Sequence, residues 1–183
     1  MPENGRDSWL AGKRPVLRFV AVLAAATIAF NAIFYLWFSR LPLFEGYLAL
    51  NAKASAVILN LFGDNVTING TSVRSDRFAM DIHLGCDGIQ ASAFFVFAVL
   101  ASPLRTSLRA RLGPAVLGTI LLLAMNLVRI LTLYWTGVHY RSAFEVMHVE
   151  VWQAAFIFLP LLLWLLWVRW AVRARIRRSD GPD

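Results

Sequence analysis

Three residues of this sequence have side chains that could together transfer an acyl group. Cys86 is the only cysteine in the 183 residues, Arg129 interrupts a long apolar run, and His148 stands just before another such run. Cysteine acyl transfer needs a thiolate that attacks, a donor that stabilises the oxyanion, and an imidazole that carries the proton. These three residues are therefore the candidate catalytic set.

The surroundings of Cys86 fit a nucleophile. Gly85 and Gly88 flank it, with Asp87 between, and glycines allow a substrate backbone to approach closely. We expect a helix to begin near residue 85, so that the thiol lies in its first turn, where the helix dipole favours thiolate. The alternative is a buried cysteine that only fills space, which is the commoner role of a lone cysteine. A single cysteine also excludes an internal disulfide.

Arg129 and His148 each have a partner at helical spacing. An arginine inside a membrane span costs about 2.5–3.5 kcal/mol on the insertion scale, so we expect Arg129 to face a polar cavity, with Asn126 on the same helix face. Its alternative is to reach outward to the membrane surface. His148 has Glu145 one turn before it, and its alternative is a plain interfacial residue. His83 and His139 are interpreted as solvated loop residues.

The elements that position these residues are membrane spans. Hydrophobic residues make up 58% of the chain and the mean hydropathy is +0.60, which is too apolar for a soluble domain. We predict one all-α polytopic domain over residues 1–183 with about four transmembrane helices. Their predicted ranges are 16–38, 85–102, 114–135 and 149–168, and the second is short enough that we expect it to extend outward past Cys86 or to tilt. Ser102-Pro103 and Gly113-Pro114 are taken to bracket the connection to the third.

The positive charges predict the orientation. The chain carries 18 Lys and Arg against 11 Asp and Glu. Arginines and lysines gather before the first span, in the loop at Arg105, Arg109 and Arg111, and in the basic tail 169–183, which places these segments in the cytoplasm. Residues 39–85 and 136–148 would then lie outside. Because the basic residues stand at span ends, we expect contact with membrane lipids and none with nucleic acid.

The first outer segment has two predicted elements. Apolar residues repeat at helical spacing between residues 47 and 61, which indicates an amphipathic helix on the outer membrane surface or over the bundle, ending at Gly63-Asp64. Its predicted apolar stripe is Tyr47, Leu50, Ala54, Val57, Ile58 and Leu61. Val66 and Ile68 then alternate with polar residues before Asn69-Gly70, a dipeptide that suits a type I′ turn, and a second alternation follows at Phe78, Met80, Ile82 and Leu84. These patterns predict a small extracytoplasmic β-hairpin or ribbon leading to Cys86.

The order of these motifs resembles the exosortase/archaeosortase family. The resemblance rests on four motifs: Cys-x-Gly-Ile at Cys86, Asn-x-x-Arg-Ile from Asn126 to Ile130, Phe-Glu-Val-Met-His ending at His148, and Val-Trp-Gln ending at Gln153. They are most similar to the short exosortase H type. Two departures are Asp87, where many members have Ser or Ala after the cysteine, and the small number of spans.

The resemblance implies a function. It implies a cysteine transpeptidase or protease of the bacterial cytoplasmic membrane, acting at the outer face on exported proteins with a C-terminal motif, a transmembrane helix and a basic tail. Cys86 would attack, Arg129 would stabilise the oxyanion and His148 would carry the proton; Asn126, Asp87, Gly88, Glu145 and Gln153 would support the site or bind substrate. No cofactor is expected, and one cysteine with scattered histidines does not make a metal site. The alternative is a non-enzymatic membrane subunit whose Arg129 binds an acidic partner helix or an anion.

Overall fold

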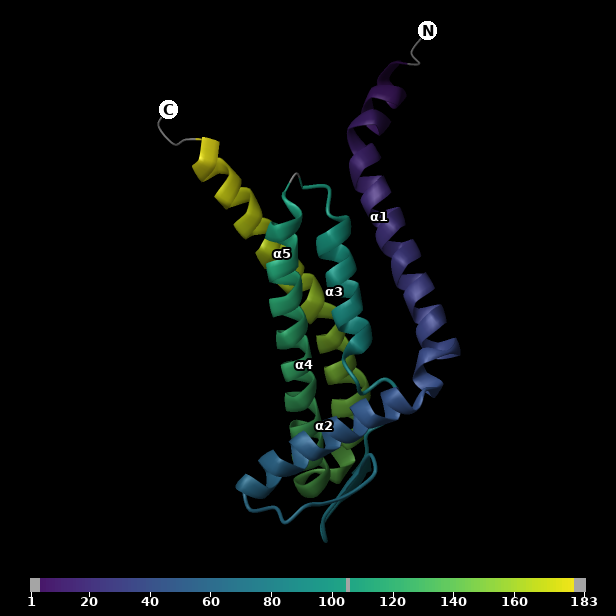
Figure 1. Ribbon diagram of the computed structural model, residues 1–183, viewed down its shortest axis with the longest axis vertical. Helices are drawn as coiled ribbons and strands as arrows, with labels where there is room; N and C mark the ends of the chain where they lie inside the picture. Colours follow the sequence, from purple (N-terminus) through teal and green to yellow (C-terminus); the bar gives the residue numbers. More distant parts are fainter. Residues whose placement is uncertain (1–3, 105, 180–183) are drawn as a thin grey trace.

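The computed structural model describes residues 4–104 and 106–179. Four helices lie side by side, namely α1 (Asn4–Leu36), α3 (Ile89–Ala101), α4 (Leu108–His139) and α5 (Trp152–Ser179). The start of α1 and the end of α5 lie at the same end of the bundle (Figure 1). Of the predicted basic segments, Arg105 and residues 180–183 lie outside the described residues. The helical membrane architecture is confirmed.

Three segments of the described chain have the length and apolarity to cross a bilayer: Lys13–Arg40, Leu108–His139 and Arg141–Ala174. The fourth apolar helix, α3, has 13 residues and is about 20 Å long at the standard rise, against a hydrocarbon core of about 30 Å. The expectation that it continues outward past Cys86 is wrong, because α3 begins at Ile89. The expected break at Gly113-Pro114 is also wrong, since α4 starts earlier, with Ser107 as its N-cap.

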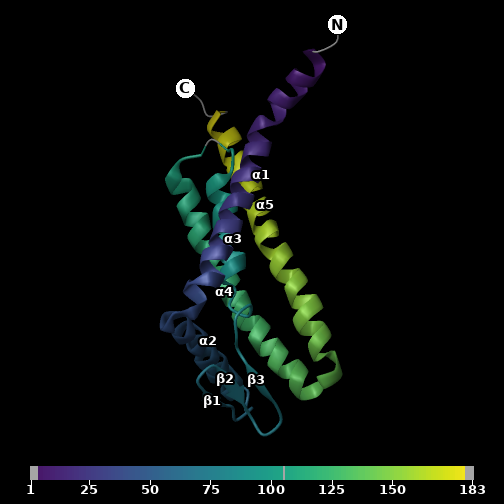
Figure 2. The same ribbon diagram turned by 90° about the vertical axis from the view of Figure 1, so that its right-hand side faces the viewer.

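At the other end of the bundle, helix α2 (Pro42–Leu61) lies across the helices (Figures 1 and 2). Pro42 begins it and Gly63, with φ of 86°, follows its end, as predicted. Its buried face is not the predicted stripe. Leu50, Val57 and Leu61 of that stripe are exposed, and the face packed on the bundle consists of Phe44, Leu48, Ala52, Ser55, Ala56 and Leu59.

A three-stranded antiparallel sheet follows α2, in the order β1 (Thr67–Asn69), β2 (Ser72–Arg74), β3 (Ala79–Asp81). The alternating stretches at residues 66–68 and 78–84 overlap β1 and β3, so strands were predicted there; β2, which lies between them and pairs with both, was not predicted. Asn69 pairs with Ser72, so the turn residues are Gly70 and Thr71. Gly70 alone has positive φ, at 62°, which is the pattern of a type II′ turn and corrects the predicted type I′.

The sheet is fixed to the bundle through α4, which continues past α3 to reach it (Figure 2). Gly137 of α4 has the Phe78 ring against its Cα, and any side chain there would collide with that ring. Tyr134, fully buried, donates a hydrogen bond to Ser75 Oγ at 2.7 Å. These contacts set where β3 lies relative to the helices.

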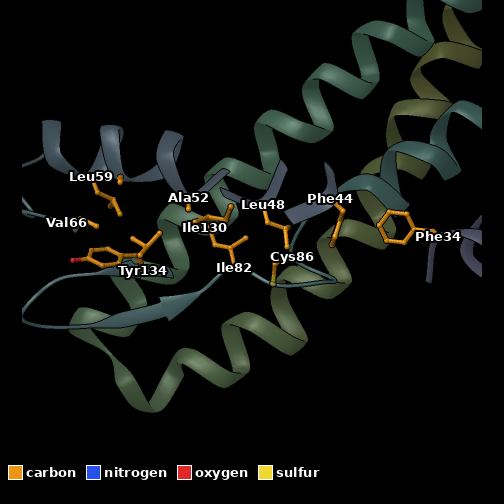
Figure 3. Close-up of a cluster of buried hydrophobic side chains, with 12 residues drawn as sticks. Phe34, Phe44, Leu48, Ala52, Leu59, Val66, Ile82, Cys86, Ile130 and Tyr134 are labelled. Carbon is orange, nitrogen blue, oxygen red and sulfur yellow. The ribbon is translucent and has the colours of Figure 1, made fainter. Parts of the chain in front are cut away.

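The core beneath α2 runs from α1 to the sheet. Figure 3 shows it as a row of side chains with Phe34 at one end, Leu59 and Tyr134 at the other, and Cys86 between them. Burial of each large apolar side chain contributes about 1.5–3 kcal/mol. The core therefore holds the segment around Cys86 against both α2 and α4.

Candidate active site

Cys86 lies in a loop, and not in a helix as expected. Gly85 and Gly88 both have positive φ, at 92° and 72°, and Gly88 caps the start of α3. The Cys86 amide donates to the carbonyl of His83 at 3.0 Å. Cys86 precedes α3 by three residues, so its sulfur does not lie in the first turn of a helix, where the helix dipole was expected to favour thiolate. The contacts around the sulfur come from other elements.

Asp87 fastens this loop from inside. Its buried carboxylate accepts the backbone N–H of Gly85 at 3.0 Å and that of Ile89 at 2.8 Å. The Tyr47 hydroxyl on α2 donates to the Asp87 carbonyl at 2.6 Å. Burial raises the pKa of the Asp87 carboxyl, and the two N–H bonds oppose that rise. The side chain thus bridges the residues on both sides of Cys86.

Helix α4 holds the same loop from the other side. Asn126 is fully buried and its amide donates to the Cys86 carbonyl at 3.1 Å, so it holds the backbone of Cys86 itself. A Cβ on Gly88 would come within 3.1 Å of the Asn126 Cβ. Gly88 therefore permits close packing of the loop on α4, whereas its expected use was to admit a substrate backbone. Gly85 has open space at that position.

Arg129 uses both arms of its guanidinium on the loop. Nη1 donates to the Gly85 carbonyl at 3.1 Å, and Nη2 lies 3.5 Å from the Cys86 sulfur. The Phe156 ring of α5 is 5.4 Å from the guanidinium carbon, at cation–π distance. Arg129 is only 6% exposed, so the alternative in which it reaches outward to the membrane surface is wrong.

His148 contacts the sulfur from a segment 62 residues further along the chain. It lies in the π-helix η3 (Val146–Val151), directly before α5, and its Nε2 is 3.3 Å from Cys86 Sγ. π-Helical turns are rare and occur frequently at functional sites, where the extra residue redirects side chains. The contact with the sulfur disfavours the alternative of a plain interfacial histidine.

His83 also belongs to this neighbourhood, which the sequence reasoning missed. It is exposed, as expected, but its ring centroid lies 6.3 Å from that of His148. The sequence held one signal for this, because His83 stands only three residues before Cys86. His139, in contrast, hydrogen-bonds the Trp135 carbonyl of its own helix at 3.0 Å.

Burial sets the resting protonation state of the Cys86 thiol. It raises the pKa of the Cys86 thiol, and the nearby Asp87 carboxylate adds to the rise, while the Arg129 guanidinium opposes it. The net direction is upward, so the thiol is neutral at rest. Such a thiol needs a base in contact, and His148 is at that position.

Two cavities meet at Cys86. Both are lined by Cys86, His83 and His148. The first, of about 430 Å³, extends between α1, α3 and α5 and includes Asn31, Tyr35, Gln90, Arg129, Gln153 and Phe156. The second, of about 850 Å³, extends along β3 and includes Phe78, Met80, Leu133, Arg141, Phe144 and Glu145.

The residues predicted to support the site or bind substrate lie in two kinds of place, along the cavities and against the Cys86 loop. Gln153 lines the first cavity and Glu145 the second, while Asp87 and Asn126 hold the loop. No group of three or more His, Cys, Asp or Glu side chains within residues 4–104 and 106–179 could hold a metal ion. The Cys86 sulfur thus lies between a cavity among the helices and one beside the sheet.

Comparison with known families finds a match over most of the chain. The model of the transmembrane exosortase family matches residues 9–151, which includes Cys86, Arg129 and His148. No curated protein and no solved structure matches the chain.

Proposed function

The chain belongs to the transmembrane exosortase family, and on that premise we propose that it is a cysteine transpeptidase or protease that processes exported proteins. Family membership supports a role in protein sorting and processing, and the helices support an integral membrane protein. The single observation that carries the proposal is the convergence on Cys86 Sγ of His148 Nε2 at 3.3 Å and Arg129 Nη2 at 3.5 Å.

The first half of the reaction forms a thioester. As Cys86 Sγ bonds to the substrate carbonyl carbon, its proton passes to His148 and the carbonyl oxygen becomes an oxyanion. Arg129 directs two N–H groups at the loop, with Nη2 3.5 Å from the sulfur, and in our proposal Nη2 donates to that oxygen. The C–N bond then breaks, and His148 returns the proton to the leaving amine.

The second half releases the acyl group. An amine acceptor or water enters, His148 takes its proton, and the new bond to the carbonyl carbon displaces the Cys86 thiolate, which recovers that proton. An amine acceptor gives a new amide and water gives a carboxylate. Asp87 and Asn126 keep the sulfur aimed throughout, because they hold the backbone on both sides of it.

The cavity among the helices supports a substrate with a transmembrane tail. In our proposal the chain makes four spans, with α3 short, and both termini face the cytoplasm of a bacterium. The substrate's helix reaches the site laterally between α1 and α5. These helices touch near the proposed cytoplasmic side, where Phe19 stacks on Trp164 with centroids 5.5 Å apart. In the outer half, the cavity separates Asn31 and Tyr35 on α1 from Gln153 on α5.

A trapped acyl-enzyme tests the proposal. Wild-type protein, quenched in acid while it processes a co-expressed protein with such a tail, should carry the substrate fragment on Cys86. Hydroxylamine should release that fragment, since it cleaves thioesters. Cys86→Ala should leave the substrate uncleaved and still bound, because it removes one atom from a loop held by other residues.

His148→Ala has a matched control in the same chain. His139→Ala removes an imidazole that bonds only its own helix, at Trp135, and should process substrate normally. His148→Ala should slow both acylation and release. Processing at the wild-type rate by Cys86→Ala would end the enzyme proposal and leave the non-enzymatic subunit in its place.

A further inference from the structure

The edge strand β3 has unused backbone groups beside the nucleophile. In the β2–β3 ladder, Ser75 N–H donates to the Phe78 carbonyl at 2.9 Å, and Ile82 N–H donates to the Thr71 carbonyl at 3.1 Å. Hydrogen-bonded pairs alternate along an antiparallel ladder, so Met80 bonds β2 while the N–H and C=O groups of Ala79 and Asp81 point away from it.

That free edge borders the larger cavity. Four consecutive residues, 78–81, line it, and Cys86 and His148 line it as well. Leu133 of α4 and Phe144 lie across from the strand. Within residues 4–104 and 106–179, no hydrogen bond satisfies the outward backbone groups of Ala79 and Asp81. An unpaired edge of this kind is a template for another strand.

We propose that the stretch of substrate just before the cleaved bond binds as an extended strand along the free edge of β3, with its last carbonyl at Cys86. This inference rests on the proposed function and assigns the substrate's exported side to the cavity beside the sheet, leaving the cavity among the helices for the transmembrane side. Recognition is mainly through the backbone, so it tolerates many sequences.

The direction of pairing follows from the chain. β3 runs from Ala79 through Asp81 toward Cys86. The acyl part of the substrate must also run toward Cys86, because its C-terminal carbonyl is the one attacked. The added strand is therefore parallel to β3. In a parallel ladder one substrate residue donates to the Ala79 carbonyl and accepts from the Asp81 N–H, and the residue two before it accepts from the Ala79 N–H.

The sheet offers a matched pair of variants. Ala79→Pro removes an N–H that β2 does not use, so the ladder stays intact. Ile68→Pro makes the same change on the opposite edge. In β1 the Thr67–Arg74 and Asn69–Ser72 pairs are the hydrogen-bonded ones, so the Ile68 N–H also points outward. Of the two positions, only Ala79 lines the cavity that Cys86 also lines.

The probe is a hexapeptide of alternating threonine and valine that ends in a chloromethyl ketone, compared with iodoacetamide. With either probe, Cys86 sulfur bonds to the probe's methylene carbon, the carbon–halogen bond breaks and halide leaves, while the thiol proton passes to His148 or solvent. Cys86 is the only thiol, so the mass of the protein reports labelling at that residue alone. Both rates are measured on the full-length protein in detergent.

Ala79→Pro should lower the labelling rate with the peptide about 3- to 10-fold, the usual worth of one net hydrogen bond, and leave the rate with iodoacetamide unchanged. Ile68→Pro should leave both rates unchanged. Methylating one amide nitrogen of the peptide at a time should slow the labelling of Cys86 at every second amide position and leave it unchanged at the positions between. Equal peptide labelling by Ala79→Pro and wild type, with no alternation, would overturn the inference. Cys86 that is labelled by iodoacetamide at the same rate in wild type and in His148→Ala would instead count against the proposed function.

Discussion

Replacing Arg129 with lysine tests whether the site needs the planar guanidinium, with its two donor arms, or only a positive charge. The guanidinium spans two acceptors, the Gly85 carbonyl at 3.1 Å and the Cys86 sulfur at 3.5 Å. A lysine ammonium keeps the charge but lacks the planar fork that reaches both positions, so we expect it to weaken both contacts. Losing one oxyanion donor lowers kcat about 100- to 1000-fold, or about 2.7–4 kcal/mol. Losing the charged bond to the carbonyl lowers the free energy of unfolding by about 1.5–3 kcal/mol.

The same helix supplies a control for that stability loss. Arg111 also forks its guanidinium onto backbone carbonyls, those of Leu100 and Leu104, near the N-terminal end of α4 and away from the sulfur. Arg111→Lys should therefore lose stability comparably and keep its turnover.

The assay is cleavage of the tail-bearing protein in detergent, with kcat divided by the folded fraction from thermal unfolding. Arg129→Lys should fall to about 1% of wild type or less per folded molecule, as expected for a missing oxyanion donor. Turnover near the wild-type value in folded Arg129→Lys would remove Arg129 from the mechanism.

Two further predictions concern the resting thiol and the topology. Because burial raises the pKa of Cys86 and only thiolate reacts with iodoacetamide, the labelling rate should reach half its maximum at a pH above the ordinary thiol value of about 8.5; a midpoint below that value would contradict a neutral resting thiol. In a Cys86→Ala background, a membrane-impermeant thiol reagent on intact cells should label Ser142→Cys and spare Leu108→Cys; labelling at residue 108 from outside would refute the proposed orientation.

The pattern of α2 shows where sequence reasoning stopped. Helical periodicity and Gly63 correctly predicted the helix and its end. The stripe was chosen by apolar content, and Leu50 and Val57 nevertheless remain exposed in the folded chain. In a membrane protein both the lipid-facing and the core-facing side of a helix are apolar, so hydropathy does not distinguish them. Small residues such as Ala52 and Ser55 mark the packed face instead.

The sequence by itself determined the kind of molecule and the residues worth testing. Apolar runs predicted the membrane helices, alternation predicted strands at residues 66–68 and 78–84, and residue type with order singled out Cys86, Arg129 and His148. Each of these signals is local in the chain, or depends only on hydrophobicity and charge, and so it can be read without coordinates.

Only the tertiary structure decided how those residues meet. The loop conformation of Cys86 depends on Asp87, Tyr47 and Asn126, whose contacts join segments about 40 residues apart. His148 reaches the sulfur, 62 residues away in sequence, from a π-helical turn that no periodicity announces. The pairing of β3 with β2 and the two cavities likewise exist only where several elements pack together. Long-range packing makes these contacts, and no local pattern encodes which partner a side chain will find.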